Sequence, residues 1–171
     1  MKFSWQTGRG QDVAEIVALA QAHFQNEIET VFRPDPIAYA RNITQAIVTQ
    51  FFSPGGELLM VANNGENTPI VAYMWVCRGQ RSAWSDEEMA LVKMVHVNLG
   101  LGVRDRIGLI QDMIAIWETW SRAQGIQIIC STTMRRDQEA FLRLHERAGY
   151  DRRGSYCYKR LDMVQAGLPI P

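Results

Sequence analysis

The order in which strand-like and helix-like segments follow one another is the feature that most constrains how this chain of 171 residues folds. In its second half, short apolar runs alternate with two helix-length segments, 107–125 and 137–149, whose apolar residues recur every three or four positions. Each of these segments separates two apolar runs, and a connection of that length fits the crossover between parallel strands. The sequence therefore predicts a sheet that is at least partly parallel.

The first half predicts two helices and an antiparallel hairpin. Residues 11–24 have apolar positions at helical spacing, and Asp35 followed by Pro36 is typical of the start of a second helix. Residues 57–63 and 69–79 are apolar runs joined by a segment rich in Asn and Gly, which indicates a hairpin.

A short first strand at residues 2–6 completes the expected order, which is β-α-α-β-β-β-α-β-α-β. The remaining expected strands are 90–98, 126–133 and 154–162. We therefore expect one α/β (α+β) domain over residues 1–162, with a mixed central sheet flanked by about four helices, followed by a tail at 163–171.

Charge and hydropathy limit the function classes. The formal net charge is zero, which argues against a nucleic-acid-binding protein that relies on bulk positive charge. No apolar run approaches the roughly 18 residues that a membrane-spanning helix needs. We expect neither nucleic acid nor membrane as a partner, and no cluster has metal-ligand spacing.

The N-terminus and the cysteines point to a reducing compartment. The first residues contain no apolar segment typical of a signal peptide. Of the three cysteines, Cys77 and Cys130 lie within apolar runs and are expected to be buried free thiols. Both observations favour a cytoplasmic protein.

The stretch HVNLGLGVRDRIGLIQDM (96–113) joins an apolar run to a helical one. Glycines at the start of a helix can let a phosphate approach backbone N–H groups, since no Cβ intervenes. A plain turn between strand and helix is the alternative interpretation.

The element order, together with Ala-Gly-Tyr (148–150) after the last expected helix, resembles the GCN5-related N-acetyltransferase (GNAT) family over roughly residues 2–160. In that family a loop of pattern Q/R-x-x-G-x-G/A holds the pyrophosphate of acetyl-coenzyme A, and the following helix ends at a glycine about 15 residues later. Counting back from Gly125 puts the pattern on residues 105–110, where only Gly108 matches. On this alignment the sequence NLGLG (98–102) is an extension of the loop.

The resemblance implies acetyl-coenzyme A as the cofactor and a set of residues that contact it. Asp105 and Ile110 depart from the family pattern, and Arg104 and Arg106 are expected to compensate by contacting phosphate. The implied contacts are Val95, Val97, Arg104, Arg106, Ile107, Gly108, Leu109, Ile110 and Ser131.

His145 is the first candidate catalytic residue. It lies in LHERAGY (144–150), where family sequences of the form L-Y-E-K-x-G-F have a tyrosine that acts as general acid toward the coenzyme A thiolate. An imidazole can do the same work near neutral pH. The alternative is a histidine at the edge of the core, because Phe141 and Leu144 share its helical face.

His96 is the candidate general base, since it lies on the strand where family members often place one. It alternates with Met94 and Val92, so a histidine on a mostly buried sheet face is the alternative. The acidic residues 86–88 before this strand are interpreted as solvated loop charges.

The resemblance implies direct acetyl transfer from acetyl-coenzyme A to a small-molecule or protein amine, without a covalent enzyme intermediate. By position, Phe32, Tyr39 and Trp84 would line the acceptor site. The alternative function is a catalytically inactive GNAT-fold protein that forms a homo-oligomer or docks to a larger assembly. The loosened motif also resembles GNAT-like proteins of tailed bacteriophages, for which the location would be the host cytoplasm or the virion.

Overall fold

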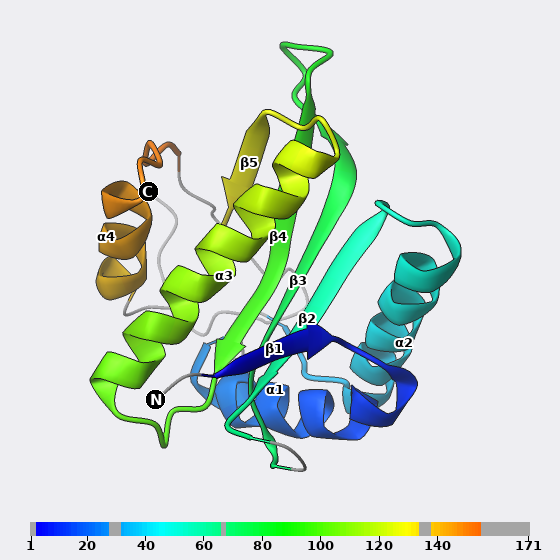
Figure 1. Ribbon diagram of the computed structural model, residues 1–171, viewed down its shortest axis with the longest axis vertical. Coiled ribbons are helices and arrows are strands. Elements are labelled where there is room, and N and C mark those ends of the chain that lie inside the picture. Colours follow the sequence, from blue (N-terminus) through cyan, green and yellow to red (C-terminus); the bar gives the residue numbers. More distant parts are fainter. Residues whose placement is uncertain (1–2, 28–31, 66–67, 134–137, 155–171) are drawn as a thin grey trace, which may run out of the picture.

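The computed structural model describes residues 3–27, 32–65, 68–133 and 138–154, which form a five-stranded sheet with helices on both faces (Figure 1). The strands are β1 (Ser4–Thr7), β2 (Glu57–Asn63), β3 (Ile70–Arg81), β4 (Glu88–Val97) and β5 (Ile128–Ser131). The helices are α1 (Val13–Glu27), α2 (Pro36–Phe52), α3 (Val103–Ala123) and α4 (Glu139–Arg147), and a 3-10 turn, Gly10–Asp12, precedes α1.

The strands lie in the sheet in chain order, β1 to β5. Neighbours from β1 to β4 are antiparallel, and β5 is parallel to β4, to which α3 connects it. The expected mixed, partly parallel sheet is confirmed. The last expected strand starts where the described residues end, so that strand and the tail at 163–171 lie outside them, and the domain boundary stays a prediction.

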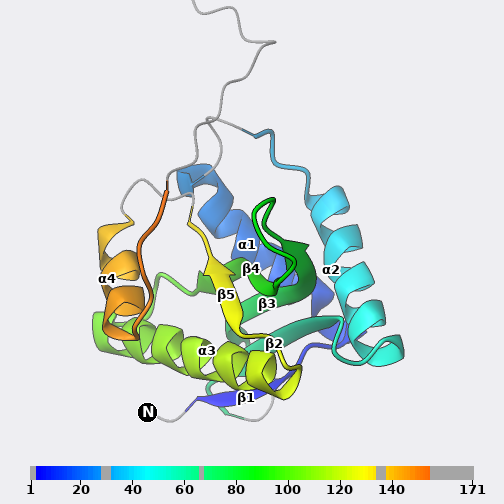
Figure 2. The same ribbon diagram turned by 90° about the horizontal axis from the view of Figure 1, so that it is seen from above.

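Two apolar layers hold the helices to the sheet. Figure 2 shows α1 and α2 on one face, and α3 with α4 beside it on the other. On the α3 face, fully buried Trp117 lies in a cluster with Val76 and Ala90. On the α1–α2 face, Ile16 and Ile43 pack on residues of the hairpin. Because the strands follow chain order, the parallel pair β4–β5 lies at one edge of this two-sided sheet.

A β-bulge at Lys93 changes which way β4 presents its side chains. Trp75 of β3 pairs with Met94, and the next residue, Val76, pairs with Val92, so Lys93 is an extra residue without a counterpart. As a result Val92 packs in the α3-face cluster, whereas Met94 packs in the α1–α2-face cluster. The expectation that Val92, Met94 and His96 share one face is therefore wrong at Val92.

The start of α2 agrees with its sequence signal. The Asp35 carboxylate accepts hydrogen bonds from the backbone N–H groups of Ile37 and Ala38, at 3.0 and 2.9 Å. Pro36 is the first residue of the helix. Both features satisfy requirements of a helix N-terminus.

The start of α3 differs from the expectation. The helix begins at Val103 with Gly102 as its N-cap, and the first intrahelical bond runs from the Arg106 N–H to the Gly102 carbonyl at 3.1 Å. The preceding turn is tight, because the Asn98 side chain accepts a bond from the Gly100 N–H at 2.8 Å. The helical segment expected at 107–125 therefore begins four residues earlier, at Val103, and residues 98–102 form the turn that precedes it.

The two described cysteines are free thiols. Cys77 is buried as expected, whereas Cys130 is only half-buried. Burial raises the pKa of both thiols. Among the described residues, no helix combines the length and the hydropathy needed to cross a membrane.

Candidate functional site

The parallel strands β4 and β5 part half-way along β4. Their ladder ends where Val92 pairs with Ser131, the last residue of β5, while β4 continues to Val97. Within the described chain, residues 93–97 therefore have a strand neighbour on the β3 side only. Backbone N–H and C=O groups at such an edge are available to a ligand that can pair with a strand.

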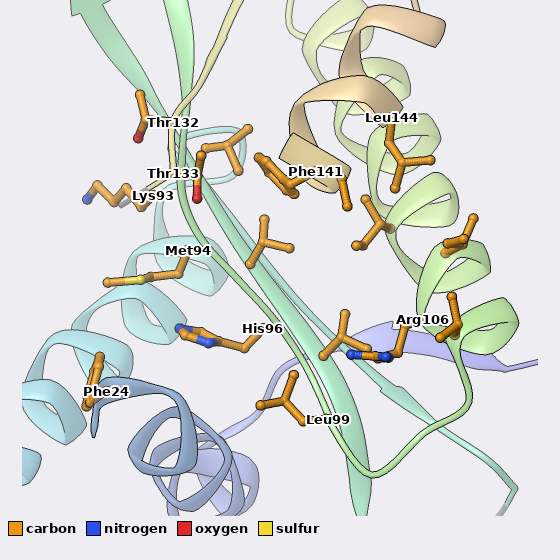
Figure 3. Close-up of a pocket in the computed structure, with 17 residues that line it drawn as sticks. Phe24, Lys93, Met94, His96, Leu99, Arg106, Thr132, Thr133, Phe141 and Leu144 are labelled. Carbon is orange, nitrogen blue, oxygen red and sulfur yellow. The ribbon is translucent and has the colours of Figure 1, made fainter. Parts of the chain in front are cut away.

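A cavity of about 310 Å³ lies at this parting, between β4, the N-terminal half of α3, and α4 (Figure 3). We call it the β4–β5 cavity. Its lining comes from α1 (Phe24), β4 (Val92, Lys93, Met94, Val95, His96, Val97), the loop (Leu99), α3 (Val103, Arg106, Ile107, Ile110), the segment after β5 (Thr132, Thr133) and α4 (Ala140, Phe141, Leu144).

The N-terminus of α3 gives this cavity an anion-binding end. The N–H groups of residues 102–105 precede the first intrahelical bond and have no partner within the helix. Together with the helix dipole they favour a negative charge at this point. Asp105 in the first turn opposes that effect.

Arg106 adds a positive charge to the same end. Its side chain lines the cavity, and its buried Nε has no hydrogen-bond partner among the described residues. The structure gives its guanidinium no ion pair within that part of the chain. A guanidinium placed in this way can bind phosphate oxygens.

Three apolar side chains form an exposed rim near this anion-binding end. Leu99, Val103 and Ile107 line the cavity although they are 39%, 63% and 38% exposed. Exposed large apolar residues that gather at a cavity indicate a site for a partly apolar ligand.

On the other side of β4 the cavity meets a buried aromatic cluster, defined by His23, Tyr39, Tyr73 and His96. His96 is 4% exposed and lies beside Phe24 and Met94 in Figure 3. Its ring centroid lies 4.7 Å from that of His23 and 5.1 Å from that of Tyr73. The Tyr73 hydroxyl shares a 2.6 Å hydrogen bond with the Tyr39 hydroxyl, and burial raises the pKa of Tyr39.

The structure does not place His145 in the cavity. This side chain is 5% exposed and packs against Trp117, Phe141 and Tyr150, with ring centroids at 5.8, 4.2 and 5.1 Å. Its Nδ1–H donates to the Phe141 carbonyl at 3.0 Å, so Nε2 carries the lone pair and has no proton to give. Burial lowers the His145 pKa. This geometry matches the alternative of a histidine at the edge of the core.

The remaining expected cofactor contacts divide into two groups. Those that line the β4–β5 cavity together with His96 are Val95, Val97, Arg106, Ile107 and Ile110. Those outside its lining are Arg104, Gly108, Leu109 and Ser131. Leu109 is fully buried in the core, Arg104 is exposed, and Gly108 lies in the second turn of α3, where a helix uses its N–H groups internally.

The expected acceptor residues Phe32, Tyr39 and Trp84 are not in the cavity lining. Trp84 is 96% exposed in the β3–β4 connection. The interpretation of Glu88 as a solvated loop charge is wrong, because it is the first residue of β4 and pairs with the Arg78 guanidinium at 2.7 and 2.6 Å. That pair lowers the Glu88 pKa to about 2.

Sequence reasoning missed several lining residues. Thr132, Thr133 and Phe141 face the cavity only because β5 and α4 come together with β4, and no local pattern marks them. Leu99 and Val103 carried a usable signal, since each is an apolar residue beside a glycine at the strand–helix junction.

Comparison with known proteins identifies the fold. No family model and no curated protein matches the sequence, but solved acetyltransferases superpose over nearly the whole chain. An aminoglycoside antibiotic 6'-N-acetyltransferase from Acinetobacter baumannii has a TM-score of 0.67 at 11% identity, covering 95% of this chain and 100% of its own. Glucosamine-6-phosphate N-acetyltransferase from Arabidopsis thaliana gives 0.67 at 12% identity, with the same coverage.

The chain has the GNAT fold. A predicted acetyltransferase from Clostridium acetobutylicum, solved with acetyl-coenzyme A, also matches, with a TM-score of 0.65 at 11% identity over 94% of this chain and 97% of its own. The expected GNAT-like architecture is therefore confirmed. Likeness at these identities shows the fold, and the activity of this GNAT-fold chain has to be argued from its own residues.

Proposed function

We propose that the protein is an N-acetyltransferase that moves the acetyl group of acetyl-coenzyme A to an amine. The observation that carries this proposal is the β4–β5 cavity, where a strand edge without a neighbour in the described part of the chain meets the N-terminus of α3 and Arg106, whose Nε has no described hydrogen-bond partner. Acetyltransferases of the same fold, one of them solved with acetyl-coenzyme A, support it.

The residues present fit acetyl-coenzyme A. The N–H groups at the start of α3 and the Arg106 guanidinium would hold the pyrophosphate. The amide groups of the pantetheine arm would pair with the edge of residues 93–97, which has no strand neighbour on the β5 side among the described residues, as an added strand does. The apolar rim of Leu99, Val103 and Ile107 would cover apolar parts of the cofactor. The bound group supplies the acetyl thioester.

His96 is the residue best placed to handle the acceptor's proton. It lines the β4–β5 cavity on the α1 side of β4, opposite the wall formed by α3 and α4 (Figure 3). In its neutral form a ring nitrogen can take a proton from an ammonium group, which leaves the amine able to attack the thioester. Geometry favours His96 for this role over His145, which lies outside the cavity lining.

A thermal melt with and without acetyl-coenzyme A tests the cofactor site. A ligand present at about 100 times its Kd adds roughly 2.7 kcal/mol to the free energy of unfolding, which raises Tm by several degrees in a chain of this size. No shift at millimolar acetyl-coenzyme A would contradict the proposal. A positive result is followed by measuring the release of free thiol with primary amines: amino sugars, diamines and lysine peptides.

The inactive, structural alternative, including a role in a phage particle, stays a prediction, as do homo-oligomer formation and the cytoplasmic location. The same melt separates the alternative from the enzyme, because an inactive scaffold that has lost the cofactor site would ignore acetyl-coenzyme A. Size-exclusion chromatography with light scattering then measures the oligomeric state.

A further inference from the structure

Lys93 is the one lysine in the part of the chain that the structure describes, and the proposed chemistry does not use its amine. It is the extra residue of the β4 bulge, and it lines the β4–β5 cavity. The ladder between β4 and β5 ends one residue earlier, where Val92 pairs with Ser131. Lys93 therefore lies at the point where the neighbour of β4 changes from β5 to the cavity.

The direction of β4 decides which end of the cofactor would lie near Lys93. The strand ends at Val97, and the loop 98–102 leads from there to the N-terminus of α3, where the phosphates would bind. Residues 93–97 span about 13 Å of strand, so an arm paired with this edge runs from Val97 toward Lys93. It ends there, because β5 occupies the same side of β4 at Val92. The thioester at the end of the arm would thus lie beside Lys93.

The position of Lys93 in the cavity agrees with this placement. Figure 3 shows Lys93 and Arg106 on opposite sides of the cavity, and both residues line it. A cofactor whose phosphates contact Arg106 and whose arm follows β4 would therefore carry its acetyl group toward Lys93.

The Lys93 ammonium is held close to the sheet. Its Nζ lies 4.3 Å from the centroid of the Trp75 ring and 3.7 Å from a Glu57 carboxylate oxygen. Glu57 also accepts a hydrogen bond from the Trp75 Nε1–H, so the two groups together form a surface that binds a cation. The Lys93 side chain is 33% exposed, which leaves its amine able to exchange protons with water.

We propose that Lys93 is an acetylation site, and that the protein transfers one acetyl group from its own bound acetyl-coenzyme A to the Lys93 Nζ. This inference rests on the proposed function, because it requires acetyl-coenzyme A in the β4–β5 cavity. The Lys93 ammonium first releases a proton to water. The neutral nitrogen then bonds to the acetyl carbon, and the C–S bond breaks with its electron pair on the sulfur. A second proton leaves the nitrogen, and the sulfur is released as the free thiol of coenzyme A.

The reaction differs from turnover on a free amine in two ways. Each chain offers one such amine, so labelling stops at one acetyl group per chain. The amine and the thioester share one cavity, so the rate per chain does not depend on protein concentration. The product is a neutral amide, which no longer forms an ion pair with Glu57.

The test incubates the purified 171-residue chain with isotope-labelled acetyl-coenzyme A, removes the cofactor and locates the label by peptide mass spectrometry. Lys93 should be acetylated at least about tenfold faster than Lys2 and Lys159, the other lysines of the sequence, which measure uncatalysed acylation. Equal labelling of all three lysines, or a rate per chain that falls on dilution of the protein, would overturn the proposal.

Variants separate the site from general reactivity. Lys93→Arg keeps a positive charge beside Glu57 but has no primary amine, so the fast phase of labelling of the intact chain should disappear; its persistence would mean that another amine is the acceptor. At subsaturating cofactor, Arg106→Gln should slow Lys93 labelling by about tenfold, whereas Arg104→Gln should slow it by less than about threefold. Excess free coenzyme A should also suppress it, and labelling that ignores this competitor is chemical acylation and contradicts the proposal.

A second readout needs no acetyl transfer. Binding of free coenzyme A places the thiol end of the arm beside Lys93, so it should shift the NMR signal of the Lys93 ε-methylene group, assigned by its loss in Lys93→Arg. If acetyl-coenzyme A raises Tm but Lys93 neither shifts nor becomes acetylated, the Lys93 proposal is wrong and the proposed function stands. If acetyl-coenzyme A does not bind at all, both are wrong.

Discussion

Arg104 and Arg106 lie two positions apart in the first turns of α3, yet only Arg106 lines the β4–β5 cavity. Two positions along a helix correspond to a rotation of about 200°, which turns the side chains to nearly opposite sides. Arg104 is exposed, while Arg106 is half-buried with its Nε enclosed and unpaired among the described residues. The two arginines therefore share a helix terminus and a charge but differ in access to a ligand.

This difference makes the arginines a matched pair for testing the cofactor site. Arg106→Gln should weaken acetyl-coenzyme A binding by about tenfold or more, because it removes a charge-assisted contact to phosphate. Arg104→Gln changes the net charge equally and should alter the Kd by less than about threefold, the residual long-range effect. Isothermal titration calorimetry measures the Kd of each variant for acetyl-coenzyme A.

Equal weakening by the two substitutions would mean that α3 attracts the cofactor through its general charge. The contact assigned to Arg106 would then be incorrect. Repeating the titrations at higher salt checks this, since screening reduces a general charge effect more than a buried contact.

Gly108 offers a test of the position of the cradle. It lies within α3, five residues after the helix begins, and a Cβ built there meets no atom within 4 Å apart from its own surroundings. Gly108→Ala should therefore raise the free energy of unfolding by about 0.5–1 kcal/mol through helix propensity. Acetyl-coenzyme A affinity should not change. Urea unfolding and calorimetry measure the two quantities, and a large loss of affinity would restore Gly108 to the phosphate site.

The contrast between α2 and α3 shows what could be predicted from the sequence. The start of α2 is set by two neighbouring residues, Asp35 as the N-cap and Pro36 as the first helical residue, and this local signal was sufficient to predict where the helix begins. For α3, the phosphate-binding pattern was placed on residues 105–110 by counting back from Gly125 with a helix length typical of the family. Here α3 has 21 residues, so the count put the cradle inside the helix.

The candidate site depends on contacts between residues that are far apart in the chain, and residue spacing along the sequence does not predict such contacts. The bulge at Lys93 shifts the period of β4 by one residue, so alternation counted from Val92 fails at Met94. The cavity exists because β5 ends at Ser131 while β4 continues, a difference in length between strands that are far apart in the chain. For His145, helical spacing alone did indicate the apolar face on which it packs.

His145 predicts a pH dependence of stability. Burial lowers its pKa in the folded protein below the ordinary value of about 6.5, so between the two values the unfolded chain binds more protons. Stability is therefore complete above about pH 6.5, falls as the pH decreases below that value, and levels off at the folded-state pKa.

Urea unfolding at about pH 5 and about pH 7.5 measures this effect. The wild type should lose more stability between these conditions than His145→Gln, in which the titrating group is absent. Equal losses in the two proteins would show that other groups cause the acid sensitivity.

Val103 allows the helix N-terminus to be tested without harming the fold. It is the first residue of α3, is 63% exposed, and lines the cavity beside the free N–H groups. Val103→Asp should leave stability unchanged or raise it by about 0.3–1 kcal/mol, since an acidic residue in the first turn favours the helix dipole. The same charge occupies the anion site and repels phosphate, so acetyl-coenzyme A affinity should fall by about tenfold or more. Val103→Asn removes the same apolar side chain without adding a charge, and it should lose much less affinity. Similar losses in both variants would instead assign the effect to the apolar rim, and the N-terminus of α3 would then not be where the cofactor's phosphates bind.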